Sequence, residues 1–117
     1  MSTPPYSPFR RAGGLVTFSG LLGRKGDAPA DGPADGLDAQ LRLIFEQLDQ
    51  RLAEVGLDRR HVIKTTVWLT DMADWEAMTV RYLEYFAGVE LPTRSAVGAQ
   101  LKPGYLVELE AWAHEEA

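Results

Sequence analysis

Leu91-Pro92-Thr93-Arg94-Ser95-Ala96-Val97 is the stretch that decides how the second half of the chain folds. Pro92 cannot continue the helical pattern before it and biases Leu91 toward an extended backbone. Beyond it the residues alternate, which predicts a short strand with Arg94 and Ala96 on one face. A guanidinium held on a strand can grip both oxygens of a carboxylate, so Arg94 is a candidate ligand-binding residue. The alternative is a solvated or salt-bridged surface arginine.

The rest of the chain shows strand and helix patterns on both sides of this stretch. Apolar residues from Leu37 to Val55 recur every three or four positions, which is typical of an amphipathic helix. Asp35 or Asp38 is expected to cap this helix, and Asp71 or Asp74 the next one. We expect strands at 9–11, 15–19, 61–70, 93–98 and 106–113, and helices at 37–55 and 75–86. This order, β-β-α-β-α-β-β, predicts a single α+β domain over residues 1–117, with two layers and both helices on one face of the sheet.

Two further segments bear on assembly and function. The polar stretch 23–36 carries a tandem Pro-Ala-Asp-Gly and is expected to be a solvated connector, or alternatively a lid over a site. On the predicted sheet, Trp112, Trp68 and Phe18 make one face too apolar to be left in water. We therefore expect oligomerisation through the sheet.

Composition excludes several classes of function. With 17 acidic and 12 basic residues the formal net charge is -5, which disfavours binding to a nucleic-acid backbone. The chain has no cysteine, and His61 and His114 form no spaced ligand motif, so we expect no metal site. No signal-like segment occurs in residues 1–8 and no long apolar run elsewhere, so we expect a cytoplasmic protein that does not bind membranes.

Arg94 and Glu108 form the candidate catalytic pair. We expect the last two strands to make a hairpin through the turn at 101–104, which would place Arg94 close to Glu108. One interpretation is a cross-strand salt bridge that contributes little. The other is that Arg94 holds a substrate carboxylate while Glu108 orients or activates a water, as a partly buried carboxylate can. Spacing alone leaves both open.

Four segments together resemble the RidA family of reactive intermediate (imine) deaminases, formerly the YjgF family, over nearly the whole chain. They are Tyr6 with 11–20 (RAGGLVTFSG), 62–72 (VIKTTVWLTDM), 92–95 (PTRS) and 107–111 (VELEA). The resemblance implies a chorismate-mutase-like fold with a mixed sheet and a homotrimer with ligand sites between subunits. It also implies hydrolysis of 2-imino acids, the tautomers of enamines, to 2-oxo acids and ammonia, with no cofactor.

The same resemblance assigns roles by position. Arg94 corresponds to a carboxylate-binding arginine and Glu108 to a water-positioning glutamate. Tyr6 corresponds to a loop tyrosine near the site, and Ser19 with Gly20 to the strand end that lines it. The chain departs from the family pattern at Ala96, where Cys is frequent, at Thr79, where Asn is common, and at 21–23 (LLG). Because these positions are expected to line the site, the alternatives are a non-catalytic trimer that binds carboxylic acids and a related hydrolase with a larger substrate.

Overall fold

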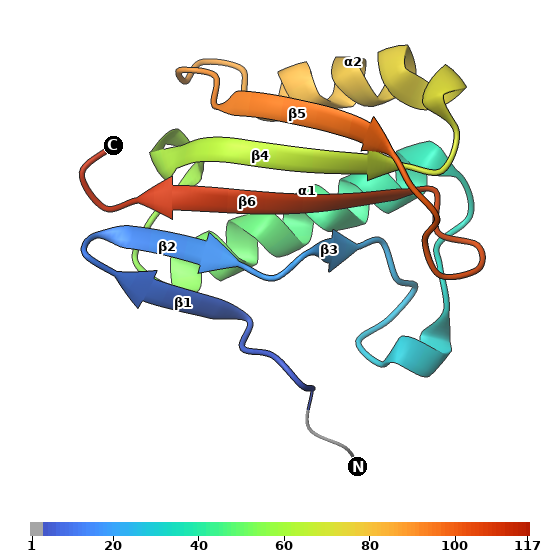
Figure 1. The fold of residues 1–117 in the computed structure, drawn as a ribbon, viewed down its shortest axis with the longest axis horizontal. Coiled ribbons are helices and arrows are strands. Elements are labelled where there is room, and N and C mark those ends of the chain that lie inside the picture. Colours follow the sequence, from blue (N-terminus) through green and yellow to red (C-terminus); the bar gives the residue numbers. More distant parts are fainter. Residues whose placement is uncertain (1–3) are drawn as a thin grey trace.

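The chain folds into two layers, a six-stranded sheet and two α-helices that pack on one of its faces (Figure 1). The computed structural model describes residues 4–117. The first three residues of the segment 1–8, in which no signal-like sequence is expected, therefore lie outside the described residues. The helices are α1 (Leu37–Glu54) and α2 (Trp75–Tyr85). The strands are β1 (Phe9–Ala12), β2 (Leu15–Phe18), β3 (Leu21–Leu22), β4 (Val62–Leu69), β5 (Thr93–Gly98) and β6 (Val107–His114). The predicted α+β architecture is confirmed; the two-residue β3 and the three short 3₁₀ turns of residues 4–117 were not expected.

The sheet is mixed, with the strand order β1-β2-β6-β4-β5 and β3 paired to β6. β1 and β2 form an antiparallel hairpin whose turn residues Gly13 and Gly14 have φ of +58° and +86°, a region that favours glycine. The β4-α2-β5 segment is a crossover unit, so β5 lies parallel to β4. β6 then pairs antiparallel with the other edge of β4. The predicted hairpin between β5 and β6 is therefore wrong, because β4 lies between them.

Residues alternate between the two faces of the sheet along β4 and β6, so that one face is buried and the other is partly exposed. On the helix side, Val67 and Leu69 of β4 and Leu109 of β6 are buried against the apolar stripe of α1. On the opposite, open face, Trp68 and Trp112 are only partly buried. This agrees with the prediction that both tryptophans lie on one apolar face of the sheet. Phe18 was expected beside these tryptophans, but its side chain lies in the core. Its strand register places it with the helix-facing residues of β2.

The helix ends differ in part from the sequence prediction. Gly36, rather than an aspartate, occupies the N-cap of α1, and no side chain caps this helix. Asp38 instead pairs with Arg81 of α2 at 3.1 Å and joins the two helices. Asp71 does act as a cap, but for the single 3₁₀ turn Met72–Asp74 that leads into α2. In the part of the chain described here, no helix has the length and apolar character needed to cross a bilayer.

Candidate functional site

Arg94 lies on the edge strand β5 and faces the helix layer. Its partner in the sheet, Thr65, forms a hydrogen bond with the Tyr82 hydroxyl of α2 at 2.6 Å. Thr65 therefore faces the helices, and Arg94, which is paired with it, faces the same way. The Arg94 guanidinium donates to Thr79 Oγ1 at 3.1 Å and lies 4.9 Å and 5.1 Å from the ring centroids of Tyr82 and Trp75. Among residues 4–117 it forms no ion pair with a carboxylate. Aromatic faces and one neutral hydroxyl therefore orient a cation whose charge is not neutralised.

Thr79 contacts this guanidinium, and Ala96 lies on the same face of β5 as Arg94. Ala96 follows two positions after Arg94 on the same face of β5 and packs against the core. Thr79 projects from α2 and supplies the hydroxyl that accepts from Arg94. These three residues form one half of the candidate site, here named the arginine half-site.

Glu108 lies on β6 and faces the open side of the sheet, opposite Trp68 of β4 and Leu22 of β3. Its side chain passes so close to Gly20 that a Cβ built there would lie 2.2 Å from Oε2 of Glu108. Gly20 therefore makes the room for the carboxylate. Burial, and to a smaller extent the neighbouring Glu110 carboxylate, raises the pKa of Glu108 above the ordinary range of a glutamate. A raised pKa suits a carboxylate that accepts and returns a proton.

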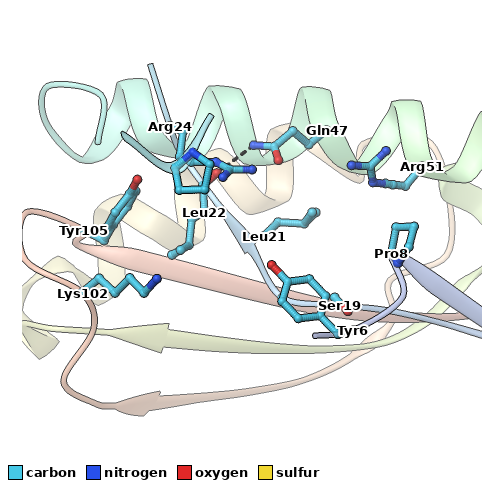
Figure 2. A pocket seen from close by; sticks show the side chains of 12 residues that line it. Tyr6, Pro8, Ser19, Leu21, Leu22, Arg24, Gln47, Arg51, Lys102 and Tyr105 are labelled. Carbon is cyan, nitrogen blue, oxygen red and sulfur yellow. Dashed lines mark hydrogen bonds between the residues drawn. The ribbon is translucent and has the colours of Figure 1, made fainter. Parts of the chain in front are cut away.

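Ser19 and Tyr6 lie beside Gly20 and complete a second cluster. Ser19 Oγ donates to the carbonyl oxygen of Ser7 at 2.7 Å, and its backbone N–H donates to Pro8 at 3.1 Å, which ties the N-terminal lead-in to the end of β2. This contact holds the exposed Tyr6 over a pocket of about 170 Å³ that Ser19 and Gly20 also line (Figure 2). We name Tyr6, Ser19, Gly20 and Glu108 the glutamate half-site.

The two half-sites do not meet within one chain. Arg94 lies opposite Thr65 and faces the helices, whereas Glu108 lies opposite Trp68, three rows along, and faces the other side of the sheet. At the usual strand spacings, two strands and three rows correspond to about 14 Å between the Cα atoms of Arg94 and Glu108. The expectation that the two side chains are neighbours is wrong for a single chain. It failed because β4 separates the two strands.

Comparison with known proteins gives the chain a family. The family model described as "Endoribonuclease L-PSP" matches residues 1–115. A RutC family protein of Pyrococcus horikoshii is 34% identical over 119 residues, covering 96% of this chain and 88% of that protein. The chain belongs to the RidA/YjgF family. A Rid family protein of Yersinia pestis superposes with a TM-score of 0.88 at 26% identity, covering 97% of this chain and 90% of that one. RidA of Psychrobacter gives 0.85 at 27% identity, covering 97% and 91%.

The pocket beside Tyr6, Ser19 and Gly20 is also lined by residues that the sequence analysis of this RidA/YjgF family member does not predict. They are Arg24, Gln47, Arg51, Lys102 and Tyr105. They come from the 23–36 segment, the outer side of α1 and the turn before β6, and each looks like an ordinary surface residue in the sequence. Only the folded chain brings them together. Within residues 4–117, no three His, Asp or Glu side chains gather into a group that could hold a metal ion.

Proposed function

We propose that the protein hydrolyses small 2-imino acids and their enamine tautomers to 2-oxo acids and ammonia. The observation that carries the proposal is the state of Arg94, which is partly buried and oriented by Thr79, yet forms no ion pair with a carboxylate of residues 4–117. A partly buried guanidinium with no carboxylate beside it is stabilised when a ligand supplies the negative charge. The carboxylate of an imino acid would supply it, in two parallel hydrogen bonds.

The separation of the half-sites supports a site shared between copies of the chain. β5, which carries Arg94, is one free edge of the sheet, and the hairpin β1–β2 with the adjoining β3 forms the other (Figure 1). A head-to-tail contact that places the β5 edge of one copy beside Gly20 and Glu108 of the next would bring both half-sites onto one substrate. Such heterologous contacts form a closed ring when the rotation closes, and three copies give the proposed homotrimer.

The chemistry needs no covalent intermediate on the protein. With the carboxylate held by Arg94, a water positioned by Glu108 attacks the imine carbon, and the Glu108 carboxylate takes one of its protons. A new C–O bond forms while the C=N π pair of the protonated imine moves to nitrogen, which gives a neutral carbinolamine. Glu108 then returns its proton to the amine nitrogen, the C–N bond breaks to release ammonia, and the hydroxyl loses its proton to solvent as the carbonyl of the 2-oxo acid forms.

Two other functions compete with this one. A non-catalytic trimer would bind the same carboxylates through Arg94 without releasing ammonia. The family name "Endoribonuclease L-PSP" suggests RNA cleavage as the other function. Against it stand the net charge of -5 and the placement of His61, whose ring lies buried against Asp58 at the start of β4. General acid–base cleavage of RNA calls for titratable groups facing a common cleft, and this histidine is not available to one.

A coupled assay tests the proposal. An amino-acid oxidase generates 2-iminopropanoate or 2-iminobutanoate in situ, and the decay of the imine is followed with and without the protein. We expect the protein to accelerate decay and Arg94→Ala to lower kcat/KM by about 100-fold, since charge-assisted hydrogen bonds contribute about 1.5–3 kcal/mol. Arg42→Ala, at an exposed arginine of α1, is the matched control and should keep full activity. An unchanged rate in the Arg94 variant would refute the assignment.

A further inference from the structure

The pocket beside Gly20 has a positive lining in an acidic protein. Three cations line it, Arg24, Arg51 and Lys102, and none of its lining residues, all of them among residues 4–117, is Asp or Glu. Acidic residues outnumber basic ones by 17 to 12 in the whole chain, so the lining opposes the overall composition. Three positive side chains around one hollow repel one another. They are expected to attract an anion strongly.

Two of these cations have no partner in the described part of the chain. Arg24 and Lys102 form no ion pair and no side-chain hydrogen bond there, whereas Arg51 pairs with Glu54 at 2.9 Å. In the view of Figure 2, the Lys102 ammonium and the Arg51 guanidinium enter the pocket from opposite sides, with the Tyr6 hydroxyl between them. The donors thus converge on one space, and an anion placed there would accept from several of them.

The wall behind the pocket is fixed rather than loose. Gln47 of α1 donates to the carbonyl oxygens of Leu22 at 2.8 Å and Leu43 at 3.2 Å, which ties the helix to β3. The hydroxyl-bearing Tyr105 is buried and forms another part of the wall. The distance between Arg51 on α1 and the strand end at Gly20 is therefore set by the fold, which favours selection by ligand length.

We propose that the preferred substrate carries a second carboxylate, which Arg24, Arg51 and Lys102 bind. This inference rests on the proposed imine deamination. Glu108 does not line the pocket, but Gly20 both lines it and lies against the Glu108 carboxylate, so a substrate whose imine carbon lies near Glu108 would reach the pocket past Gly20. Its volume of about 170 Å³ compares with cavities of about 150 Å³ that hold a six-membered carbon ring. A side chain of four or five heavy atoms that ends in a carboxylate fits this space.

The test compares two imines of equal chain length. Amino-acid oxidases generate 2-iminoglutarate from glutamate and 2-iminopentanoate from norvaline. We expect kcat/KM of the wild-type protein to be about tenfold or more higher for 2-iminoglutarate, because charge-assisted hydrogen bonds favour the second carboxylate. Arg24→Gln with Lys102→Gln should remove this preference and leave 2-iminopentanoate within about twofold. Lys25→Gln, which removes the same charge from an exposed neighbour paired with Asp35, should leave the preference intact.

The outcomes separate the two proposals. Equal kcat/KM values for both imines, or a preference that survives in the double variant, would overturn the pocket assignment and leave imine deamination standing. If neither imine is hydrolysed faster with protein, the proposed function fails. Calorimetric titration with glutarate and butyrate then decides the pocket: tighter binding of glutarate that the double variant abolishes supports it, and equal binding overturns it. Thermal melting checks that the double variant folds, as expected for side chains with no partners within residues 4–117.

Discussion

At the scale of single residues, the protonation of Glu108 gives the clearest signature of the proposed chemistry. Burial and the Glu110 carboxylate raise the pKa of Glu108 above 4.5, the ordinary value for a glutamate. The base form is lost as the pH falls through this raised pKa, so kcat/KM should begin to fall at a pH above 4.5. Glu108→Gln should remove this acid limb and lower kcat by about 100-fold or more, with a smaller change in KM.

Two controls accompany the Glu108 variant. Glu110→Gln should stay active and shift the acid limb to lower pH, because one of the two causes of the raised pKa is gone. In the folded state Glu108 binds its proton more tightly than in the unfolded chain, so the stability that this provides is present at low pH and lost as the pH rises through the raised pKa. At pH 7, Glu108→Gln should therefore unfold in urea at no lower concentration than the wild type. Loss of fold in this variant, or an unchanged kcat, would contradict the role.

Gly20 and Gly23 offer a matched pair of alanine substitutions. The three atoms nearest to a Cβ at Gly20 all belong to the Glu108 side chain, which can turn away, whereas a Cβ at Gly23 meets the Gln40 backbone Cα at 2.4 Å. Gly20→Ala should displace the carboxylate and lower kcat about tenfold or more while the free energy of unfolding stays within about 1 kcal/mol. Gly23→Ala should instead destabilise the fold by about 2 kcal/mol or more, since α1 must shift. Full activity in Gly20→Ala would show that the carboxylate position is not critical.

At the scale of elements, the sequence predicts the helices and strands whose positions depend on local periodicity. The apolar stripe of α1, the alternation in β4 and the break at Pro92 each act over a few neighbouring residues, and these elements form as predicted. Strand order depends on contacts between distant segments. Nearness in sequence favoured a β5–β6 hairpin, but the crossover through α2 places β5 on the outer edge of β4 and leaves its inner edge to β6.

The same distinction explains the partial prediction of the candidate site. Arg94, Glu108 and Gly20 lie in segments that are recognisable in the sequence alone, so the sequence predicts the residues of each half-site but not where they lie in space. Arg24 and Lys102 belong to turns between the elements, where a lone cation carries no signal. Their convergence on one pocket depends on how two loops pack against α1, which no local pattern in the sequence records.

Gln40 joins these two loops to α1 and should determine their stability. Its side chain is fully buried, donates to the carbonyl oxygens of Ala34 and Gly104 at 3.0 Å each, and accepts from the backbone of Leu106 at 2.8 Å. Gln40→Leu removes three hydrogen bonds and leaves backbone groups unsatisfied, so we expect a loss of about 3 kcal/mol in the free energy of unfolding, measured with urea. Gln50→Leu, exposed on the same helix, should change it by less than about 0.5 kcal/mol. Equal effects of the two substitutions would disprove this role for Gln40.

At the scale of the whole molecule, the proposed site requires more than one chain. Arg94 and Glu108 face opposite sides of one sheet, so no side-chain rotation brings both to a small substrate. The open face with Trp68 and Trp112 provides apolar surface for a contact between copies. We expect sedimentation velocity to give about three times the chain mass of 12.9 kDa. A monomer at micromolar concentration would contradict the shared site, because the half-sites would then never meet.

Complementation between inactive variants tests the shared site directly. Chains with Arg94→Ala keep Glu108, and chains with Glu108→Gln keep Arg94, so each variant alone lacks one residue at every site. In trimers co-assembled at random from equal amounts, about a quarter of the sites receive both intact residues from two different chains. Because about a quarter of the sites are intact, the rate of imine decay in the mixture should reach about a quarter of the wild-type rate. Mixing Arg94→Ala with a chain that carries both Arg94→Ala and Glu108→Gln should restore nothing, since no chain then carries Arg94. Sites contained within single chains would give no recovery in either mixture, because no chain in them has both residues.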